Sequence, residues 1–216
     1  MASWMTHLRI ADGLLGSIGS LPQTHFIAGN IAPDSGEPNG DWSEFTPPKE
    51  FTHYTIGGFS RPESAENFRK KYLVSFKNDE EKAFYLGYYA HLLADYISII
   101  EIFKPKREKY AVSKEQEWEF GWKIKQDMHD LDQLFLKEHP GFRAFCIFEN
   151  ISSFPNVYLD YFTENAFDKR FAYIAEFYRS FEGDLDSDYP YFTKNEIDDF
   201  IKKTTKEIQV KISELM

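Results

Sequence analysis

The spacing of apolar residues along the chain predicts helices over most of its length. Apolar positions recur three and four residues apart, as on one face of an α-helix, and Pro, Gly and capping residues separate the runs. The predicted helices cover residues 5–16, 22–31, 63–76, 142–151, 165–181 and 194–215. No pair of segments combines alternating apolar residues with hairpin turn residues. The pattern therefore predicts an all-α fold, a multi-helix bundle that forms a single domain over residues 1–216.

Two longer helices are predicted in the middle of the chain. Asn78 is a suitable N-cap for the first, which we expect to end at Pro105. Ser113 and Gln116 have the spacing of a capping box and open the second, which runs to about Glu138.

Residues 32–62 form a long stretch without a helical pattern. Pro, Gly, Asn and Asp are concentrated there, a composition that favours loop. A loop of this length inside a compact domain is usually either functional or disordered. Its aromatic residues favour an ordered segment: Trp42, Phe45, Phe51 and Tyr54.

A histidine and an aspartate interrupt the most apolar of the predicted helices. The segment from Ala83 to Phe103 carries formal charge only at Asp95 and Glu101, and such a helix should be buried. His91 and Asp95 are four residues apart, so both side chains lie on one face. A bare carboxylate in a core is costly unless it is compensated. Either a metal ion or a hydrogen bond from a neutral imidazole would compensate it, and the pair alone leaves both open.

Five further residues are candidates for the same chemistry. His7 shares a stripe with apolar residues of the first predicted helix and should point inward. His53 follows two prolines in the long loop, where it could be aimed at a site, and Asp34 is either a site residue or a turn residue that bonds its own backbone. Asp127 and Asp132 fall on apolar stripes of the helix that ends near residue 138 and are also expected to face the core.

Composition narrows the kind of site. One cysteine, Cys146, excludes an internal disulfide framework and cysteine-rich zinc sites. Imidazole and carboxylate ligands without thiolate suit zinc, iron or manganese, and two such ions can act together on a phosphoester. Lys and Arg total 25 against 35 Asp and Glu, a net charge of −10, which disfavours polymeric nucleic acid and stable membrane association. Without a signal-like or membrane-spanning segment, a cytoplasmic protein is expected.

Four sequence segments, taken in order, resemble a known family. SWMTHLRIADGLL, FIAGNIAPDSG, FTHY and GYYAHLLADY are similar to motifs of the zinc-dependent phospholipase C superfamily, which includes the fungal single-strand nucleases. The likeness is to its short bacterial hydrolase-like members and covers residues 3–180. It implies the helical bundle of that superfamily. It also implies that His53, His91 and Asp95 bind one ion, that Asp95 bridges to a second ion bound by His7, and that Asp34 is a ligand or the general base that orients water.

The sequence also departs from this family in two places. Secreted members bind metal through the amino and carbonyl groups of a processed N-terminal Trp, whereas Trp4 follows three residues and its nitrogen is an amide. The HxxxE motif that holds a further zinc is absent. Asp127 and Asp132, in DMHDLD, resemble an aspartate pair of the short members that would replace it, with His129 as a competitor.

These observations lead to a primary hypothesis and two alternatives. The first is a metal-dependent hydrolase of a small, soluble phosphoester, either a phosphodiester or a phosphomonoester. One to three divalent ions, zinc or else iron or manganese, would activate the water. The second is a non-catalytic helical protein in which the ion is structural. The third is a helical interaction domain whose His and Asp pairs are only buried hydrogen bonds. The sequence does not predict an oligomeric state.

Overall fold

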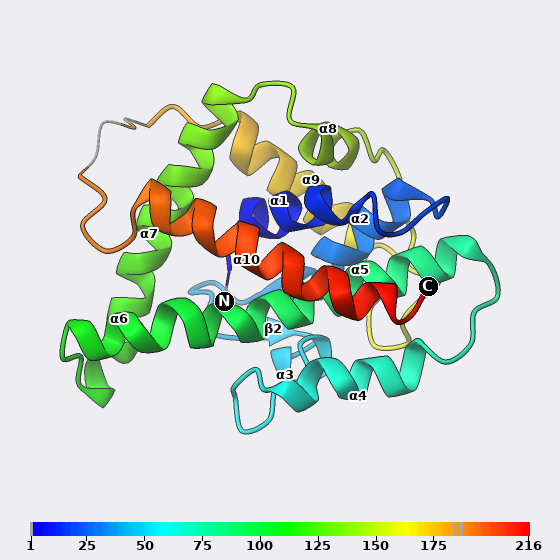
Figure 1. Cartoon of the computed structure of the whole chain (residues 1–216), viewed down its shortest axis with the longest axis horizontal. Coiled ribbons are helices and arrows are strands. Elements are labelled where there is room, and N and C mark those ends of the chain that lie inside the picture. The colour runs from blue at the N-terminus through cyan, green and yellow to red at the C-terminus, as the bar shows by residue number, and fades with distance from the viewer. Residues whose placement is uncertain (1, 184, 186–187) are drawn as a thin grey trace.

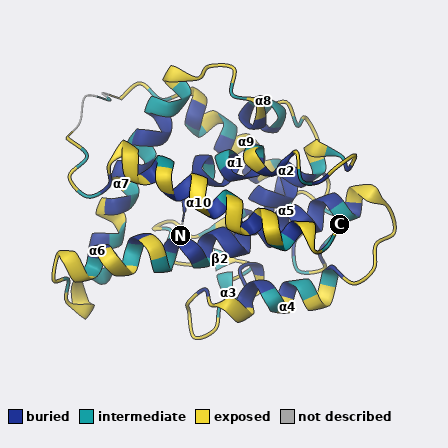
Figure 2. Ribbon diagram, in the orientation of Figure 1, coloured by how far each residue is buried: buried dark blue, intermediate teal, exposed yellow. Residues whose placement is uncertain are grey.

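A computed structural model describes residues 2–183, 185 and 188–216, and it confirms the all-α class (Figure 1). At its centre lies α5 (Asp79–Ser98), whose residues from Ala83 to Ser98 are nearly all buried (Figure 2). The helix begins as predicted, since the side chain of Asn78 accepts a hydrogen bond from the backbone N–H of Glu81. The apolar sequence of α5 is thus explained by its position inside the bundle.

The two N-terminal helices pack directly on α5. These are α1 (Trp4–Leu14) and α2 (Gln23–Ile31), and α2 makes the most extensive contact with α5 among the described elements. The contact depends on two glycines, because a Cβ at Gly29 would lie 2.0 Å from the carbonyl oxygen of Phe84, and one at Gly87 would lie 2.0 Å from that of Phe26. The absence of side chains at these positions therefore lets the two backbones touch.

The remaining helices cover this core. In front of α5 in Figure 1 lies α10 (Lys194–Ser213), which packs on α1 and α5 and turns its polar face outward (Figure 2). On the lower side α4 (Pro62–Tyr72) packs on α5. At the top α8 (Arg143–Glu149) contacts α1, α2 and α9 (Ala166–Arg179). The helix α7 (Glu117–Glu138) runs along one side and is preceded by a 3₁₀ turn, Lys114–Gln116, that the predicted capping box opens.

The predicted end of the central helix at Pro105 is wrong. After α5 the chain continues through a π-helical turn, Ile99–Phe103, into α6 (Lys104–Lys109). The N–H of Lys104 bonds to the carbonyl of Ile99, five residues earlier, so the hydrogen-bond ladder has widened just before the proline. Pro105 then occupies the first turn of α6, where a missing N–H is tolerated.

The segment 32–62 is ordered into short pieces. A 3₁₀ turn, Ala32–Asp34, is followed by β1 (Glu37–Pro38), β2 (Phe45–Thr46) and α3 (Lys49–Thr52). The two strands form an antiparallel pair. With two residues each they are too short to show alternation, which is why the sequence did not predict them. No helix in the part of the chain that the structure describes is long and apolar enough to cross a membrane.

Candidate metal centre

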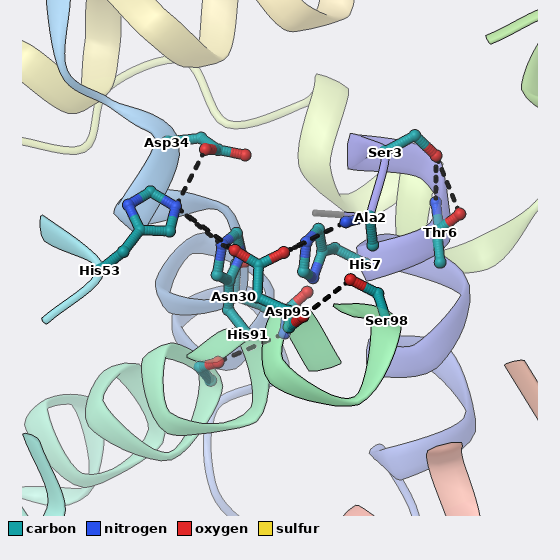
Figure 3. Close-up of polar contacts among 11 residues, drawn as sticks. Ala2, Ser3, Thr6, His7, Asn30, Asp34, His53, His91, Asp95 and Ser98 are labelled. Carbon is teal, nitrogen blue, oxygen red and sulfur yellow. Dashed lines mark hydrogen bonds and ion pairs between the residues drawn. The ribbon is translucent and has the colours of Figure 1, made fainter. Parts of the chain in front are cut away.

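Five of the predicted site residues meet in the interior of the bundle (Figure 3). His7 comes from α1, and His91 and Asp95 come from α5. Asp34 ends the 3₁₀ turn that extends α2, and His53 directly follows α3. The close packing of α1 and α2 on α5 therefore gathers residues that are as much as 88 positions apart, from His7 to Asp95.

The Asp95 carboxylate lies at the middle of this group. Its Oδ1 is 3.4 Å from His7 Nε2, and its Oδ2 is 3.7 Å from both His53 Nε2 and His91 Nε2. His53 Nε2 lies 3.2 Å from Asp34 Oδ1 and 3.4 Å from His91 Nε2. Two overlapping sets of potential ligand atoms result, all within 4.8 Å of one another: His7, His91 and Asp95, and Asp34, His53 and His91. The two sets share His91, and each also contains one further imidazole and one carboxylate.

Neighbouring groups fix the orientation of two of the imidazoles. His91 Nδ1 lies 2.8 Å from the carbonyl oxygen of Asn30, which can only accept a hydrogen bond. Nδ1 therefore carries the proton, and in the neutral ring the lone pair of Nε2 faces the centre. His53 Nδ1 lies 2.8 Å from Thr52 Oγ1, and the carbonyl of Thr52 accepts a hydrogen bond from the Tyr88 hydroxyl. Such second contacts are the usual way in which ligating histidines are held.

The donor atoms at the centre lack the partners that buried polar groups normally have. The side chains of His7, His53, His91 and Asp95 are 0–1% exposed. Both ring nitrogens of His7 and the Oδ2 of Asp95 have no hydrogen-bond partner among the described residues. Leaving such groups unpaired in a core costs free energy, and a cation would remove that cost. The residues present therefore fit a divalent ion of the kind that imidazole and carboxylate ligands bind.

Burial and the neighbouring charges set the protonation of the group. Burial and the charge of His91 lower the pKa of His7 to about 4, and burial also lowers the pKa of His53. Burial alone would raise the pKa of Asp95, but the adjacent His7 and His91 hold it well below its usual range. Burial opposes a charge on His91, yet Asp95 outweighs it and raises the pKa of His91. Ionised Asp95 and neutral His7 and His53 are thus in the state in which such ligands bind metal, and an ion at His91 would displace the proton that Asp95 favours there.

Asp34 differs from the other four residues because it reaches solvent. Its side chain is 17% exposed and borders a small hollow that Lys49 and His53 also line. Burial would raise its pKa, but the hydrogen bond to His53 and the charges of His91 and Lys49 hold that pKa below its usual range. Asp34 is therefore an ionised carboxylate at the open side of the centre.

The structure does not bring Asp127 into this centre. Asp127 is buried, as its stripe predicted, but its Oδ2 accepts hydrogen bonds from the backbone N–H groups of Tyr191 (2.6 Å) and Phe192 (2.9 Å). The carboxylate thus ties α7 to the segment that leads into α10.

Asp132 and Trp4 also lie outside the two sets of ligand atoms. Asp132 accepts hydrogen bonds from the hydroxyls of Ser3 and Tyr178, both at 3.0 Å, and burial raises its pKa to about 7. The ring of Trp4 packs face to face with His129 at 6.4 Å and edge-on to Phe177 at 5.5 Å. The ligand roles that the resemblance implied for Asp127 and Asp132 remain predictions, while these residues here hold the N-terminal segment and α10 on α7.

Some contacts of the centre were not visible in the sequence. The backbone N–H of Ala2 donates to Asp95 Oδ1 at 3.1 Å, and the side chain of Asn30 donates to the carbonyl of Gly87 at 3.3 Å. In each contact one of the two partners is a backbone group, and a pattern of side chains in the sequence does not indicate such contacts. The one available signal is that Asn30 precedes Asp34 by one helical turn.

One comparison with known proteins found a match, and it covers the part of the chain that holds the centre. The sequence model of a family described as zinc dependent phospholipase C matches residues 6–98, a segment that contains all five residues of the centre and ends before α7. No curated protein and no solved structure matches the chain. The family match agrees with the helical fold and with the buried His and Asp donors. Over residues 6–98, the part of the chain that holds the centre, the sequence is therefore similar to the zinc-dependent phospholipase C family.

Proposed function

We propose that the protein is a metal-dependent hydrolase that cleaves a phosphoester with water as the nucleophile. The observation that carries this proposal is the Asp95 carboxylate, buried between three imidazoles with an unpartnered oxygen, beside the solvent-reaching carboxylate of Asp34. A purely structural cluster would not require an ionised carboxylate at its open side. Hydrolysis of a phosphoester requires a group there that can accept a proton from water.

The residues divide into those that bind metal and one that handles the proton. Asp95 presents Oδ1 to His7 and Oδ2 to His53 and His91, an arrangement that favours it as a ligand shared by two ions. When bound, divalent ions, zinc by the family match or else iron or manganese, would supply a water of lowered pKa and neutralise phosphoryl charge. Asp34 Oδ1 lies 3.2 Å from His53 Nε2 at the open side of the centre, and its carboxylate would orient that water and take its proton. Asp127 and Asp132 stay proposed as further ligands, although hydrogen bonds from Tyr191 and from Ser3 already engage their carboxylates.

The proposed substrate is a small phosphoester. The net charge of −10 opposes polymeric nucleic acid and anionic membrane surfaces, while a small anion can be bound by local charge at the site. A cytoplasmic location is part of this proposal, since the substrate would be free in solution.

The experiment compares metal-loaded protein on phosphomonoesters, phosphodiesters, nucleotides and phosphatidylcholine. Asp34→Asn should retain metal and lower kcat by roughly 10²–10⁴-fold, because general-base catalysis contributes that much. Asp160→Asn removes a carboxylate whose side chain is 80% exposed and should leave kcat unchanged. If the protein holds stoichiometric metal but hydrolyses none of these substrates, the proposal is wrong.

The structural-ion hypothesis is favoured by one observation, the near-complete burial of the ligand side chains. Chelation separates the two functions. Removing metal from a catalytic centre in a stable bundle should abolish hydrolysis and leave the far-ultraviolet circular dichroism intact. Removing an ion that holds the core together should melt the helices, because binding energy is then folding energy.

A further inference from the structure

The hollow at the open side of the centre is lined by a lysine. Lys49, which is half-buried, shares this hollow with Asp34 and His53. The other described lining residues are Pro33, Gly36, Phe45 and Thr52. Burial lowers the pKa of His53, so its imidazole is neutral near neutral pH. Among the described lining residues, Lys49 is therefore the one that brings a positive charge to the hollow.

The short helix α3 fixes where Lys49 lies relative to His53. The backbone N–H of His53 donates to the carbonyl of Lys49 at 2.8 Å, so the two residues are one helical turn apart. His53 Nε2 in turn lies 3.2 Å from Asp34 Oδ1, at the edge of the group in Figure 3. Burial raises the pKa of Asp34, but the hydrogen bond to His53 and nearby positive charge, that of Lys49 included, lower it. The electrostatics of the hollow thus agree with its geometry.

The ammonium group of Lys49 contacts an aromatic wall of the same hollow. Its Nζ lies 4.7 Å from the centre of the Phe45 ring, the geometry of a cation–π contact. Phe45 belongs to β2, and a Cβ added at Gly36 would lie 3.2 Å from the Phe45 Cβ, so these two lining residues pack closely. Because Phe45 lines the hollow, this contact places the ammonium group at the hollow rather than in bulk solvent.

Arg170 fixes the wall that Gly36 and Phe45 form. Its buried side chain donates a hydrogen bond to the carbonyl of Gly36 at 2.5 Å. The guanidinium carbon lies 5.3 Å from the ring centres of both Trp42 and Tyr173, and the Trp42 ring is 6.2 Å from the Phe45 ring. These contacts tie the β1–β2 pair to α9, so the ring that the ammonium group contacts has a fixed position.

A phosphoester that reaches the hollow meets the ionised carboxylate of Asp34. The two groups are both negatively charged, and in a partly buried site they repel each other strongly at a separation of a few ångströms. A cation that contacts both relieves this repulsion, and lysine suits the task because it is a point charge on a flexible stem. Resting on the proposed function, we infer that Lys49 is a substrate-binding residue, whose ammonium group donates to an unesterified oxygen of the phosphoryl group and holds that group beside Asp34.

The test measures the binding of inorganic phosphate to zinc-loaded protein. Lys49→Gln removes the charge and should weaken phosphate binding roughly tenfold or more, the size of a lost charge-assisted hydrogen bond. Lys49→Arg keeps the charge and should retain most of the binding. The zinc content of the same samples should be unchanged in both variants, because Lys49 belongs to neither set of potential ligand atoms.

Lys71→Gln is the matched control. Lys71 lies in α4, where its ammonium group is 4.8 Å from the centre of the Tyr72 ring and its side chain is 54% exposed, but it does not line the hollow. This substitution also removes one positive charge and one cation–π contact, so it should leave phosphate binding unchanged. An equal loss of phosphate binding in Lys71→Gln and Lys49→Gln would be an effect of net charge and would overturn the inference.

The outcomes separate this inference from the proposed function. If phosphate binding depends on Lys49 but no phosphoester is hydrolysed, the binding role of Lys49 stands and the hydrolase proposal fails. If phosphoesters are hydrolysed but Lys49→Gln binds phosphate as well as the unsubstituted protein does, the role of Lys49 is overturned and the hydrolase proposal stands. Loss of zinc from Lys49→Gln, or absence of phosphate binding by the unsubstituted protein at millimolar concentration, would also overturn that role.

Discussion

The contact between α2 and α5 both packs the core and holds the candidate metal centre, so Gly87→Ala should damage both. A Cβ at Gly87 would lie 2.0 Å from the Phe26 carbonyl oxygen and 2.8 Å from the Asn30 nitrogen. Both contacts are with backbone, so a rotamer change cannot relieve them. The helices must separate by on the order of 1 Å to reach an ordinary contact distance. The carbonyl of Asn30, now 2.8 Å from His91 Nδ1, would move with α2.

The magnitude follows from two opposing effects. Overpacking a core costs about 1–3 kcal/mol and sometimes more, and a clash between two backbones belongs at the upper end of that range. Alanine in place of glycine within a helix stabilises by about 1 kcal/mol. The expected net loss in the free energy of unfolding is about 2 kcal/mol. Because a partner that orients a ligating histidine is displaced, zinc affinity should fall about 10–100-fold.

Gly121→Ala is the matched control. Gly121 also lies inside a helix, α7, but a Cβ there would meet nothing within 4 Å. This variant should gain about 0.5–1 kcal/mol and keep its zinc affinity. Urea unfolding of the metal-free proteins measures the first quantity, and competition with a chromogenic chelator measures the second. Equal stabilisation by the two substitutions would refute the close-packing argument, and normal zinc affinity in a destabilised Gly87→Ala variant would refute the coupling to His91.

Two further predictions concern buried polar groups around the centre. Asp132 has a pKa of about 7 when folded, against about 3.9 when unfolded, so between these values the folded state binds more protons and stability falls as pH rises. Asp132→Asn removes this loss. In unfolding experiments on metal-free protein, the free energy of unfolding of the variant should exceed that of the unsubstituted protein by near zero at pH 4 and by about 2–4 kcal/mol at pH 8. A difference that does not change with pH would contradict the environment assigned to Asp132. Tyr88→Phe leaves the buried Thr52 carbonyl without its hydrogen-bond donor, so the free energy of unfolding should fall by about 1–2 kcal/mol. Zinc binding should also weaken, because Thr52 contacts His53. Unchanged zinc affinity would show that this contact does not support the ligand.

Helical spacing predicted the fold class and the inward direction of His7, His91 and Asp95, whereas Asp34 and His53 were candidates from the long loop and from the family resemblance. Helical spacing reports which side of a helix faces the core, and polar residues on an apolar face are rare enough to be informative. This reasoning placed His91 and Asp95 in the interior, and it was also right that Asp127 and Asp132 are buried. The direction of a side chain does not specify its partner, however, and the structure gives these two carboxylates hydrogen bonds away from the centre.

The features that sequence could not supply depend on backbone geometry. Pro105 continues a helix because the preceding turn is π-helical, and local sequence does not encode that widening in a recognisable way. The orientation of His91 comes from a backbone carbonyl, and the position of α2 comes from a contact between two glycines.

The claim on which the rest depends is that the buried His and Asp cluster binds divalent metal through Asp95. Elemental analysis of the protein purified without added metal, beside Asp95→Asn, tests it directly. We predict close to two divalent ions per chain in the unsubstituted protein, with zinc the main metal, and the loss of at least one in the variant, because both carboxylate oxygens face imidazole nitrogens. A well-folded protein that contains no metal and takes up none from a zinc buffer would contradict the account.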